Sequence, residues 1–320
     1  MSETKILIYG DLHLSSKAYG AHRDYPKESL EYLNKITSIA KLNNVDYIVG
    51  LGDFTFGRFH SLEYRAAIEK ELEEQARITN GNHFELKGNH DEAGYGLTER
   101  DFYISKGLLK EPCNLTFDKV NISMINYGKL DSTDVLIDDN KINIALAHDF
   151  FKFSTSNTLN FGKAIELDFC HKLFGLDYLV CGHVHKIMEF TGNVFNADKN
   201  LAHELKVKYL GCMMRPAYRD GYMDDHGELL LLTITEDELN TNIINVPLWE
   251  LKDSFNLELK QEEYNKKADK DARVDISDVV KQLDTHDRNI GSPEDIIAEL
   301  KDIPEKYKNK AINLLKNALA

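Results

Sequence analysis

Five short polar segments, each placed where an apolar, strand-like run ends, constrain this chain more than any other feature. They are Gly10-Asp11-Leu12-His13, Gly52-Asp53, Gly88-Asn89-His90-Asp91, Ala147-His148-Asp149 and Gly182-His183-Val184-His185. Together they supply carboxylates, an amide and imidazoles, the side chains that ligate first-row divalent metals. Because the five segments follow one another within the first 185 residues, the pattern predicts one metal site built from several strand ends.

The spacing inside these segments indicates which side chains can share an ion. Asp11 and His13 alternate at a strand end, as do His183 and His185, so each pair can face one pocket. Two cations about 3.5–4 Å apart can clamp the attacking and leaving oxygens of a displacement at phosphorus. Such a pair needs negative charge between the ions, and Asp53, midway in the motif order, is the candidate bridge. Nitrogen and oxygen ligands without cysteine favour Mn, Fe, Zn or Co over Ca or Mg.

The segments resemble the motif set of the calcineurin-like metallophosphoesterase superfamily, D-x-H, GD, GNH[DE], H and GHxH, over roughly residues 5–215. Within it, the GNHD form and the segment 207–215 (VKYLGCMMR) resemble the SbcD-type DNA-repair nucleases and their phage recombination relatives. Those nucleases usually carry a second Asp shortly after the GD motif, and residues 54–58 contain none. The resemblance implies a two-metal phosphodiester hydrolase and, more narrowly, a Mn-dependent DNA nuclease, with Fe, Zn, Co and Mg as other metals.

We expect each side chain of the motifs to have one of three roles. One ion would be held by Asp11, His13, Asp53 and His185, and the other by Asp53, Asn89, His148 and His183. His90 is interpreted as an unligated general acid or transition-state partner that Asp91 orients, because Asn89 already supplies a ligand at that strand end. Substrate contacts are predicted for Arg215, Arg219 and His22, with ordinary surface charge as the alternative for the two arginines.

The hydrophobic pattern predicts an α/β fold. Strand-like runs at 5–10, 45–51 and 83–86 alternate with helical patterns at 27–42 and 61–78, a layout that places loops at the carboxyl ends of strands. Later strands are expected at 120–126, 135–137, 142–147, 178–181, 206–210, 228–235 and 241–248, with a helix at 164–174. We expect a four-layer sandwich of two mixed β-sheets flanked by helices, in which the later strands complete the second sheet.

The composition shifts near Trp249, which suggests two regions in the 320 residues. Residues 1–250 are the expected catalytic domain, and residues 251–320 a polar, mainly helical C-terminal appendage. The apolar stripe at 311–319 is expected to dock on the chain's own core, with partner binding as the alternative. No apolar run approaches the roughly 20 residues that span a bilayer. The N-terminus does not read as a signal peptide, and no cysteine pair has C-x-x-C spacing, so a cytoplasmic location is expected.

The net charge of −14 bears on the choice of substrate. A surface that wraps nucleic acid is normally basic, so the charge favours the alternative of a small-molecule or nucleotide phosphodiesterase or phosphatase. The SbcD-type resemblance instead implies DNA as substrate and an SMC-like ABC ATPase of the SbcC type as partner. It leaves open a homodimer, RNA instead of DNA, and exonuclease or endonuclease action. A metal-bound scaffold is disfavoured by the complete ligand set, and a protein Ser/Thr phosphatase by the missing Arg after the GD motif.

Overall fold

The computed structural model describes residues 3–17, 22–56, 60–91, 97–154, 164–214 and 224–258. Residues 1–255 group into one unit, and a second unit begins at Asn256. The expected C-terminal helices and their apolar stripe lie outside the described residues, as do Arg215 and Arg219. In the part of the chain that is described, no helix combines the length and the apolar character needed to cross a membrane.

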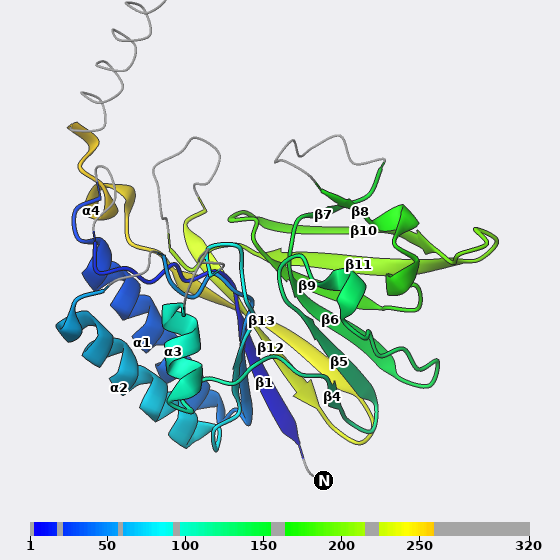
Figure 1. Cartoon of the computed structure of the whole chain (residues 1–320), viewed down its shortest axis with the longest axis horizontal. Coiled ribbons are helices and arrows are strands. Elements are labelled where there is room, and N and C mark those ends of the chain that lie inside the picture. The colour runs from blue at the N-terminus through cyan, green and yellow to red at the C-terminus, as the bar shows by residue number, and fades with distance from the viewer. Residues whose placement is uncertain are drawn as a thin grey trace, which may run out of the picture. The chain divides into compact units, whose positions relative to one another are not determined.

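A five-stranded mixed sheet carries the first three motif segments (Figure 1). Its order is β13-β12-β1-β2-β3, with bounds Thr4–Tyr9 for β1, Tyr47–Gly50 for β2, His83–Glu85 for β3, His226–Ile234 for β12 and Leu239–Pro247 for β13. β1, β2 and β3 are parallel, so the loops that follow them lie at the same edge of the sheet. The expectation that the last two strands join the second sheet is wrong, because β12 pairs antiparallel with the whole of β1, and β13 pairs with β12.

Three α-helices accompany this sheet, of which two were expected. α1 (Tyr25–Asn43) and α2 (Leu62–Ile78) confirm the helical patterns, and each starts at a capping side chain that accepts a backbone N–H, Asp24 and Ser61. α3 (Glu99–Ser105) was not expected. Its sequence signal is a short one, because Thr98 and Asp101 cap each other's backbone N–H groups in a capping box.

A six-stranded sheet carries the other two motif segments. Its order is β10-β11-β9-β6-β5-β4, with bounds Leu115–Thr116 for β4, Val120–Ile125 for β5, Ile142–His148 for β6, Tyr178–Gly182 for β9, Ile187–Phe195 for β10 and Ala202–Leu210 for β11. β5, β6, β9 and β11 run parallel, which places His148 and His183 at neighbouring strand ends.

Two local expectations in this half are wrong. Residues 135–137 form no strand, because the N–H of Leu136 donates to Ser123 Oγ instead of to a neighbouring strand. The expected helix at 164–174 is replaced by β8 (Ile165–Glu166), which pairs with β7 (Phe151–Lys152), and by two 3-10 turns, η2 (Leu167–Phe169) and η3 (His171–Leu173). Cys170 between the turns has ψ of 73°, which interrupts a helical path. A third 3-10 turn, η1 (Leu130–Ser132), follows β5.

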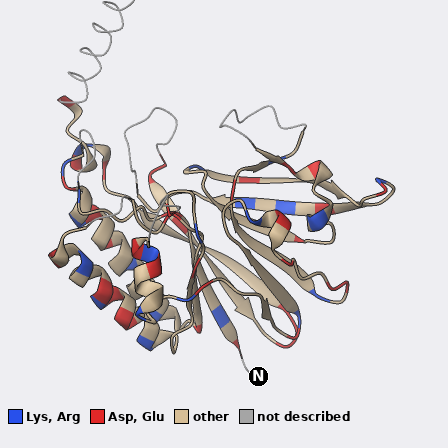
Figure 2. Ribbon diagram, in the orientation of Figure 1, with Lys and Arg blue, Asp and Glu red and all other residues tan. Residues whose placement is uncertain are grey.

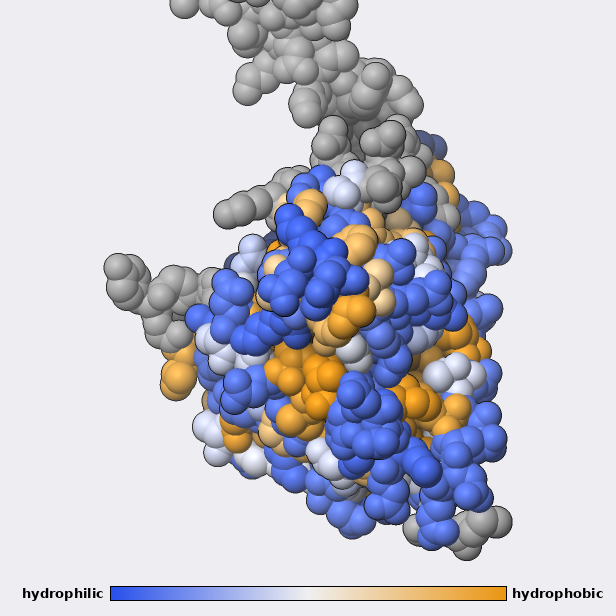
Figure 3. Space-filling view, turned by 90° about the vertical axis from the view of Figure 1, so that its right-hand side faces the viewer, coloured by the Kyte–Doolittle hydropathy of each residue, from blue (hydrophilic) through white to orange (hydrophobic). Residues whose placement is uncertain are grey.

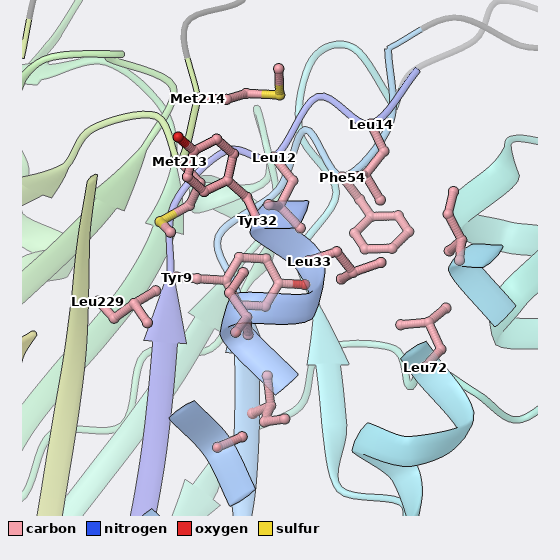
Figure 4. Close-up of a cluster of buried hydrophobic side chains, with 14 of the residues drawn as sticks. Tyr9, Leu12, Leu14, Tyr32, Leu33, Phe54, Leu72, Met213, Met214 and Leu229 are labelled. Carbon is pink, nitrogen blue, oxygen red and sulfur yellow. The ribbon is translucent and has the colours of Figure 1, made fainter. Parts of the chain in front are cut away.

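The alternation of β1 explains why layers form on both of its sides. Ile6 and Ile8 belong to a buried cluster shared with residues of β5 and β6, so they pack between the two sheets. Leu7 and Tyr9 face the other way and pack with residues of α1 and α2, in the cluster that Figure 4 shows. A third cluster covers the far side of the second sheet beside η2 and η3. The predicted α/β class with two mixed sheets is confirmed.

The end of this unit packs against the start of α1. α4 (Leu251–Ser254) presents Ser254, whose hydroxyl donates to Glu28 Oε1 over 3.0 Å. The backbone N–H of Trp249 donates to Tyr32 Oη over 2.7 Å, and the Phe255 side chain is buried. Residues up to 255 therefore contribute to the packing of the first unit, and a separate function for the chain beyond residue 250 stays a prediction.

Candidate metal centre

The five motif segments meet where the strand ends of the two sheets face each other. Asp11, His13, Asp53 and Asn89 follow strands of the first sheet, and His148, His183 and His185 end or follow strands of the second. The two halves are joined directly: the His183 N–H donates to both oxygens of Asp11, over 3.1 and 3.0 Å. All the predicted ligands thus belong to one cluster, although their sequence separation reaches from residue 11 to residue 185.

The first ligand group consists of Asp11, His13, Asp53 and His185. His13 Nε2 lies 2.9 Å from His185 Nε2, and His185 Nε2 lies 3.3 Å from Asp11 Oδ2. The distance from His13 Nε2 to Asp53 Oδ2 is 3.7 Å. Bonds of about 2.0–2.2 Å to one ion put neighbouring ligand atoms roughly 3–3.6 Å apart. The four side chains therefore fit a shared divalent ion.

The second group consists of Asp53, His148 and His183, with the amide of Asn89 between them. Asn89 Oδ1 lies 3.1 Å from His148 Nε2 and 2.8 Å from His183 Nδ1. His148 Nε2 is also 3.5 Å from Asp53 Oδ2, the same oxygen that faces His13 in the first group. A carboxylate shared by two ligand groups is the geometry that a bridging ligand requires.

Several ligands lie on strained backbone. His13, Asp53 and His183 have φ of 48°, 51° and 79°, in the left-handed region that side chains other than glycine adopt at some energetic cost. Gly52 has φ of 99°, and a Cβ there would come within 2.6 Å of His148 Nδ1 and 2.9 Å of the Gly88 nitrogen. Glycine before Asp53 is thus required both by the turn and by the close approach of two other ligand-bearing segments.

Hydrogen bonds behind the ligands fix their orientation. His148 Nδ1 lies 2.7 Å from the carbonyl oxygen of Leu51, so its N–H donates there and leaves the Nε2 lone pair for an ion. The backbone N–H of His90 donates to Asp53 Oδ1 over 2.8 Å, which leaves Asp53 Oδ2 facing both ligand groups. These contacts hold the His148 imidazole and the Asp53 carboxylate in positions that suit metal binding.

The charges of the cluster are arranged for cations. Burial alone would raise the pKa of Asp11 and Asp53, but the neighbouring imidazoles, His148 above all, hold both values below the ordinary range. Burial opposes a charge on His148 as well, yet the carboxylates of Asp11 and Asp53 outweigh it and raise the pKa of His148 to about 9. His13 is the contrary case, because burial and the nearby His185 lower its pKa to about 3.

Metal binding is expected to release a proton from His148 at pH 7–8. An imidazole must be neutral to ligate a metal, whereas the metal-free ring stays protonated up to about pH 9. Metal affinity should therefore rise with pH up to about 9 and level off above it. Calorimetric titration of Mn²⁺ in two buffers of different ionisation enthalpy measures the release, and His148→Asn is the matched control. Heats that do not depend on the buffer at pH 7.5 would contradict this assignment.

His90 and Asp91 lie beside the cluster rather than within either ligand group. The His90 side chain is exposed, with its ring centre 5.1 Å from that of His13. The buried Asp91 accepts the Gly88 N–H over 2.9 Å through Oδ2, and its Oδ1 has no hydrogen-bond partner among the described atoms. Asp91 thus holds the turn that carries Asn89 and His90, and its orientation of the His90 ring stays a prediction. Burial and the charge of Asp53 raise the pKa of Asp91 to about 7.

Of the three predicted substrate contacts, His22 alone lies within the described residues. His22 is buried, with Nε2 3.6 Å from Glu28 Oε2 and its ring against Tyr25 and Phe255. Its contact with substrate stays a prediction. Arg215 and Arg219 lie outside the described residues, so their role stays a prediction too.

Three neighbours of the centre were missed by sequence reasoning. The thiol of the buried Cys212 groups with His13 and His185, and donates to the Asp11 carbonyl oxygen over 3.2 Å. The Tyr127 ring lies 5.9 Å from that of His183, and the Phe56 ring 4.9 Å from that of His90. Neither aromatic residue belongs to a motif. For Cys212 the available signal was its position directly after Gly211, in the segment that resembles the nucleases.

The fold and the ligand groups define a metal-dependent hydrolase with its centre between two sheets. The profile of the calcineurin-like phosphoesterase family matches residues 4–187, more than half of the chain and all five motif segments. The chain therefore belongs to the calcineurin-like phosphoesterase family, whose members hydrolyse phosphoesters with divalent metals. A search of curated proteins gave no match.

Proposed function

We propose that this protein hydrolyses phosphodiesters with two divalent metal ions, and that its substrate is DNA. The observation that carries the proposal is the placement of Asp53 Oδ2 within reach of His13 in one ligand group and of His148 in the other. Manganese is the proposed metal, with Fe, Zn, Co or Mg as alternatives, because most ligand atoms are imidazole nitrogens and carboxylate oxygens.

Different residues of the chain have different roles in such a reaction. When bound, a pair of divalent ions supplies a nucleophilic water at neutral pH and neutralises charge on the phosphoryl oxygens. Asp53 and Asp11 contribute the buried negative charge that holds two cations close together. The exposed His90 imidazole beside His13 can donate a proton to the leaving oxygen. A sugar alkoxide leaves poorly without that proton, so this position suits a diester of a nucleoside.

Basic side chains on the described surface are interspersed with acidic ones in Figure 2, so the proposal confines recognition of DNA to the neighbourhood of the metal centre. On β11, Lys206 and Lys208 are paired with Glu189 and Glu228, over 2.8 and 2.5 Å. The resemblance of residues 207–215 to SbcD-type nucleases supports DNA as substrate and an SMC-like ABC ATPase of the SbcC type as the partner that supplies further contacts.

A small-molecule or nucleotide phosphodiesterase is the second candidate, and the net charge of −14 favours it. A comparison of Mn²⁺-supplemented rates on linear duplex DNA, single-stranded DNA and bis-p-nitrophenyl phosphate separates the two. The nuclease proposal expects cleavage of at least one DNA substrate at a rate above that of the small ester. Hydrolysis of the small ester with both DNA substrates intact would favour the second candidate.

Removal of residues 259–320 is expected to leave hydrolysis of the small ester unchanged and to weaken DNA processing or partner association. Every proposed ligand precedes residue 186, and the packing of Ser254 and Phe255 is kept by this boundary.

Exposed apolar residues of the described part come from separate elements, such as Leu42, Phe169 and Leu201, and polar side chains interrupt the apolar patches of the face in Figure 3. We therefore propose that the surface that docks on the ATPase partner lies within residues 259–320.

The measurement is a rate on bis-p-nitrophenyl phosphate beside a DNA cleavage assay, for the shortened and the full-length chain. If the shortened and full-length chains cleave DNA equally and bind the ATPase partner equally, residues 259–320 have no role in DNA processing or partner association. Loss of activity on the small ester would make the segment part of the catalytic unit.

A further inference from the structure

A buried tyrosine on β1 and a buried glutamate on β3 meet across β2, the strand between them in the first sheet. The strand register aligns Tyr9 on β1 with Gly50 on β2, and Gly50 with Glu85 on β3. The Tyr9 hydroxyl donates to Glu85 Oε2 and lies 3.1 Å from His83 Nε2. Figure 4 shows Tyr9 projecting from β1 into the cluster on the helix side of the sheet.

This contact depends on the missing side chain between the two residues. A Cβ on Gly50 would come within 2.0 Å of Glu85 Oε2, so any larger residue there would separate Tyr9 from Glu85. Both side chains are fully buried. A buried carboxyl costs free energy unless its oxygens are hydrogen-bonded, and burial raises the pKa of Glu85 to about 8. The hydrogen-bond partners of Glu85 offset this cost, and they therefore indicate which parts of the structure Glu85 holds in place.

The second oxygen of Glu85 reaches the segment that carries the bridging ligand. Glu85 Oε1 accepts the N–H of Gly52 over 3.2 Å, at the left-handed turn directly before Asp53. The backbone of Glu85 is fixed in turn by the buried Arg100, whose Nε and Nη2 donate to the Glu85 carbonyl oxygen over 3.0 and 2.6 Å. One rigidly held carboxyl thus connects β1, the β2 turn and β3.

Each of these three strands leads into a ligand of the centre. Tyr9 precedes Asp11 by two residues, Gly52 precedes Asp53, and Glu85 lies four residues before Asn89. A change in the side chain of Glu85 would therefore be felt at three ligand-bearing segments at once, although Glu85 is not itself a ligand.

We propose that Glu85 is a positioning residue, which through its hydrogen bonds to Tyr9 and Gly52 sets the spacing of the strand ends that carry Asp11, Asp53 and Asn89. The proposal rests on the proposed two-metal centre, but it concerns metal affinity and not the identity of the substrate. Partners that orient ligands in this way typically contribute 10–100-fold to metal affinity or activity.

The test compares Glu85→Leu with Glu85→Gln by competition for Mn²⁺ against a chromogenic chelator, without substrate. Glu85→Leu removes both acceptors and is expected to weaken Mn²⁺ binding by about 10–100-fold. Glu85→Gln is expected to rescue most of the affinity, because its amide oxygen can accept the Gly52 N–H while its amide nitrogen donates to Tyr9, which then donates to His83. On bis-p-nitrophenyl phosphate, Glu85→Leu should lower kcat with little change in KM.

Gln75→Leu is the matched control. Gln75 is equally buried and donates to Thr37 in the helical layer over 2.9 Å, so its loss should lower thermal stability and leave Mn²⁺ affinity unchanged. Mn²⁺ affinity of Glu85→Leu at the wild-type value, with or without a lower Tm, would overturn the proposal.

Tyr9→Phe keeps the proposal falsifiable if Glu85→Leu does not fold. It removes only the hydroxyl, and it should weaken Mn²⁺ binding severalfold in a folded protein. If Glu85→Leu fails to fold, unchanged Mn²⁺ affinity in a folded Tyr9→Phe variant would overturn the proposal. If the wild type binds two metals in a Glu85-dependent way but cleaves no phosphodiester, the proposed function fails and the positioning role stands.

Discussion

Asp53→Asn is expected to abolish phosphodiester hydrolysis and to reduce tightly bound metal to at most one ion per chain. The substitution keeps the shape of the side chain and removes the charge shared by the two ligand groups. Two divalent ions about 4 Å apart repel each other by roughly 16 kcal/mol at an effective dielectric constant of about 20. A neutral amide offers no comparable attraction to offset this repulsion, so the second ion should be lost.

Elemental analysis after gel filtration measures the metal content, and hydrolysis of bis-p-nitrophenyl phosphate measures activity. Asp46→Asn is a suitable control, because Asp46 is exposed just before β2 and accepts the backbone N–H of Lys5. It should keep both metals and full activity. Two full equivalents of tightly held metal in Asp53→Asn would rule out the bridging role.

His90→Asn is expected to keep both metals and to lower the rate of DNA cleavage by about 10²–10⁴, the usual contribution of one positioned acid or base. The ligands of both groups remain in this variant, and the His90 backbone N–H still donates to Asp53. The defect should shrink on a p-nitrophenyl ester, whose leaving group needs no proton. Asp91→Asn should give a milder loss, because Asp91 holds the turn at Gly88.

Rates on both substrates are compared with metal content, and His171→Asn serves as the control for loss of a histidine. His171 is exposed and hydrogen-bonds the Phe195 carbonyl oxygen away from the ligands, so its loss should leave both rates unchanged. Equal losses on DNA and on the activated ester in His90→Asn would argue for charge stabilisation in place of proton donation. Loss of one metal would make His90 a ligand.

The clustering of the candidate ligands could be predicted from the sequence, because each is tied to a local signal. Asp11, Asp53 and His183 each lie within three residues of the end of an apolar strand, and parallel strands bring their carboxyl ends to one edge of a sheet. The helices α1 and α2 were predictable for the same reason, since their caps and apolar faces lie within each segment.

Features that depend on distant partners could not be predicted. The pairing of β12 with β1 joins residues more than 200 positions apart, and no local pattern says which sheet a strand buried on both faces joins. Glu85 looks like an ordinary polar residue in its segment, and its burial follows only from the register that places it beside Gly50 and Tyr9. The 3-10 turns η2 and η3 could not be predicted either, because the spacing of their apolar residues fits an α-helix equally well.

Hydrolysis by two metals acting together at Asp53 is tested by a titration of the metal-free protein with Mn²⁺. Metal bound per chain and the rate on bis-p-nitrophenyl phosphate are followed in the same samples. Little activity is expected after the first equivalent, and a steep rise as the second binds. Full activity at one equivalent per chain, or none with two equivalents bound, would contradict this mechanism.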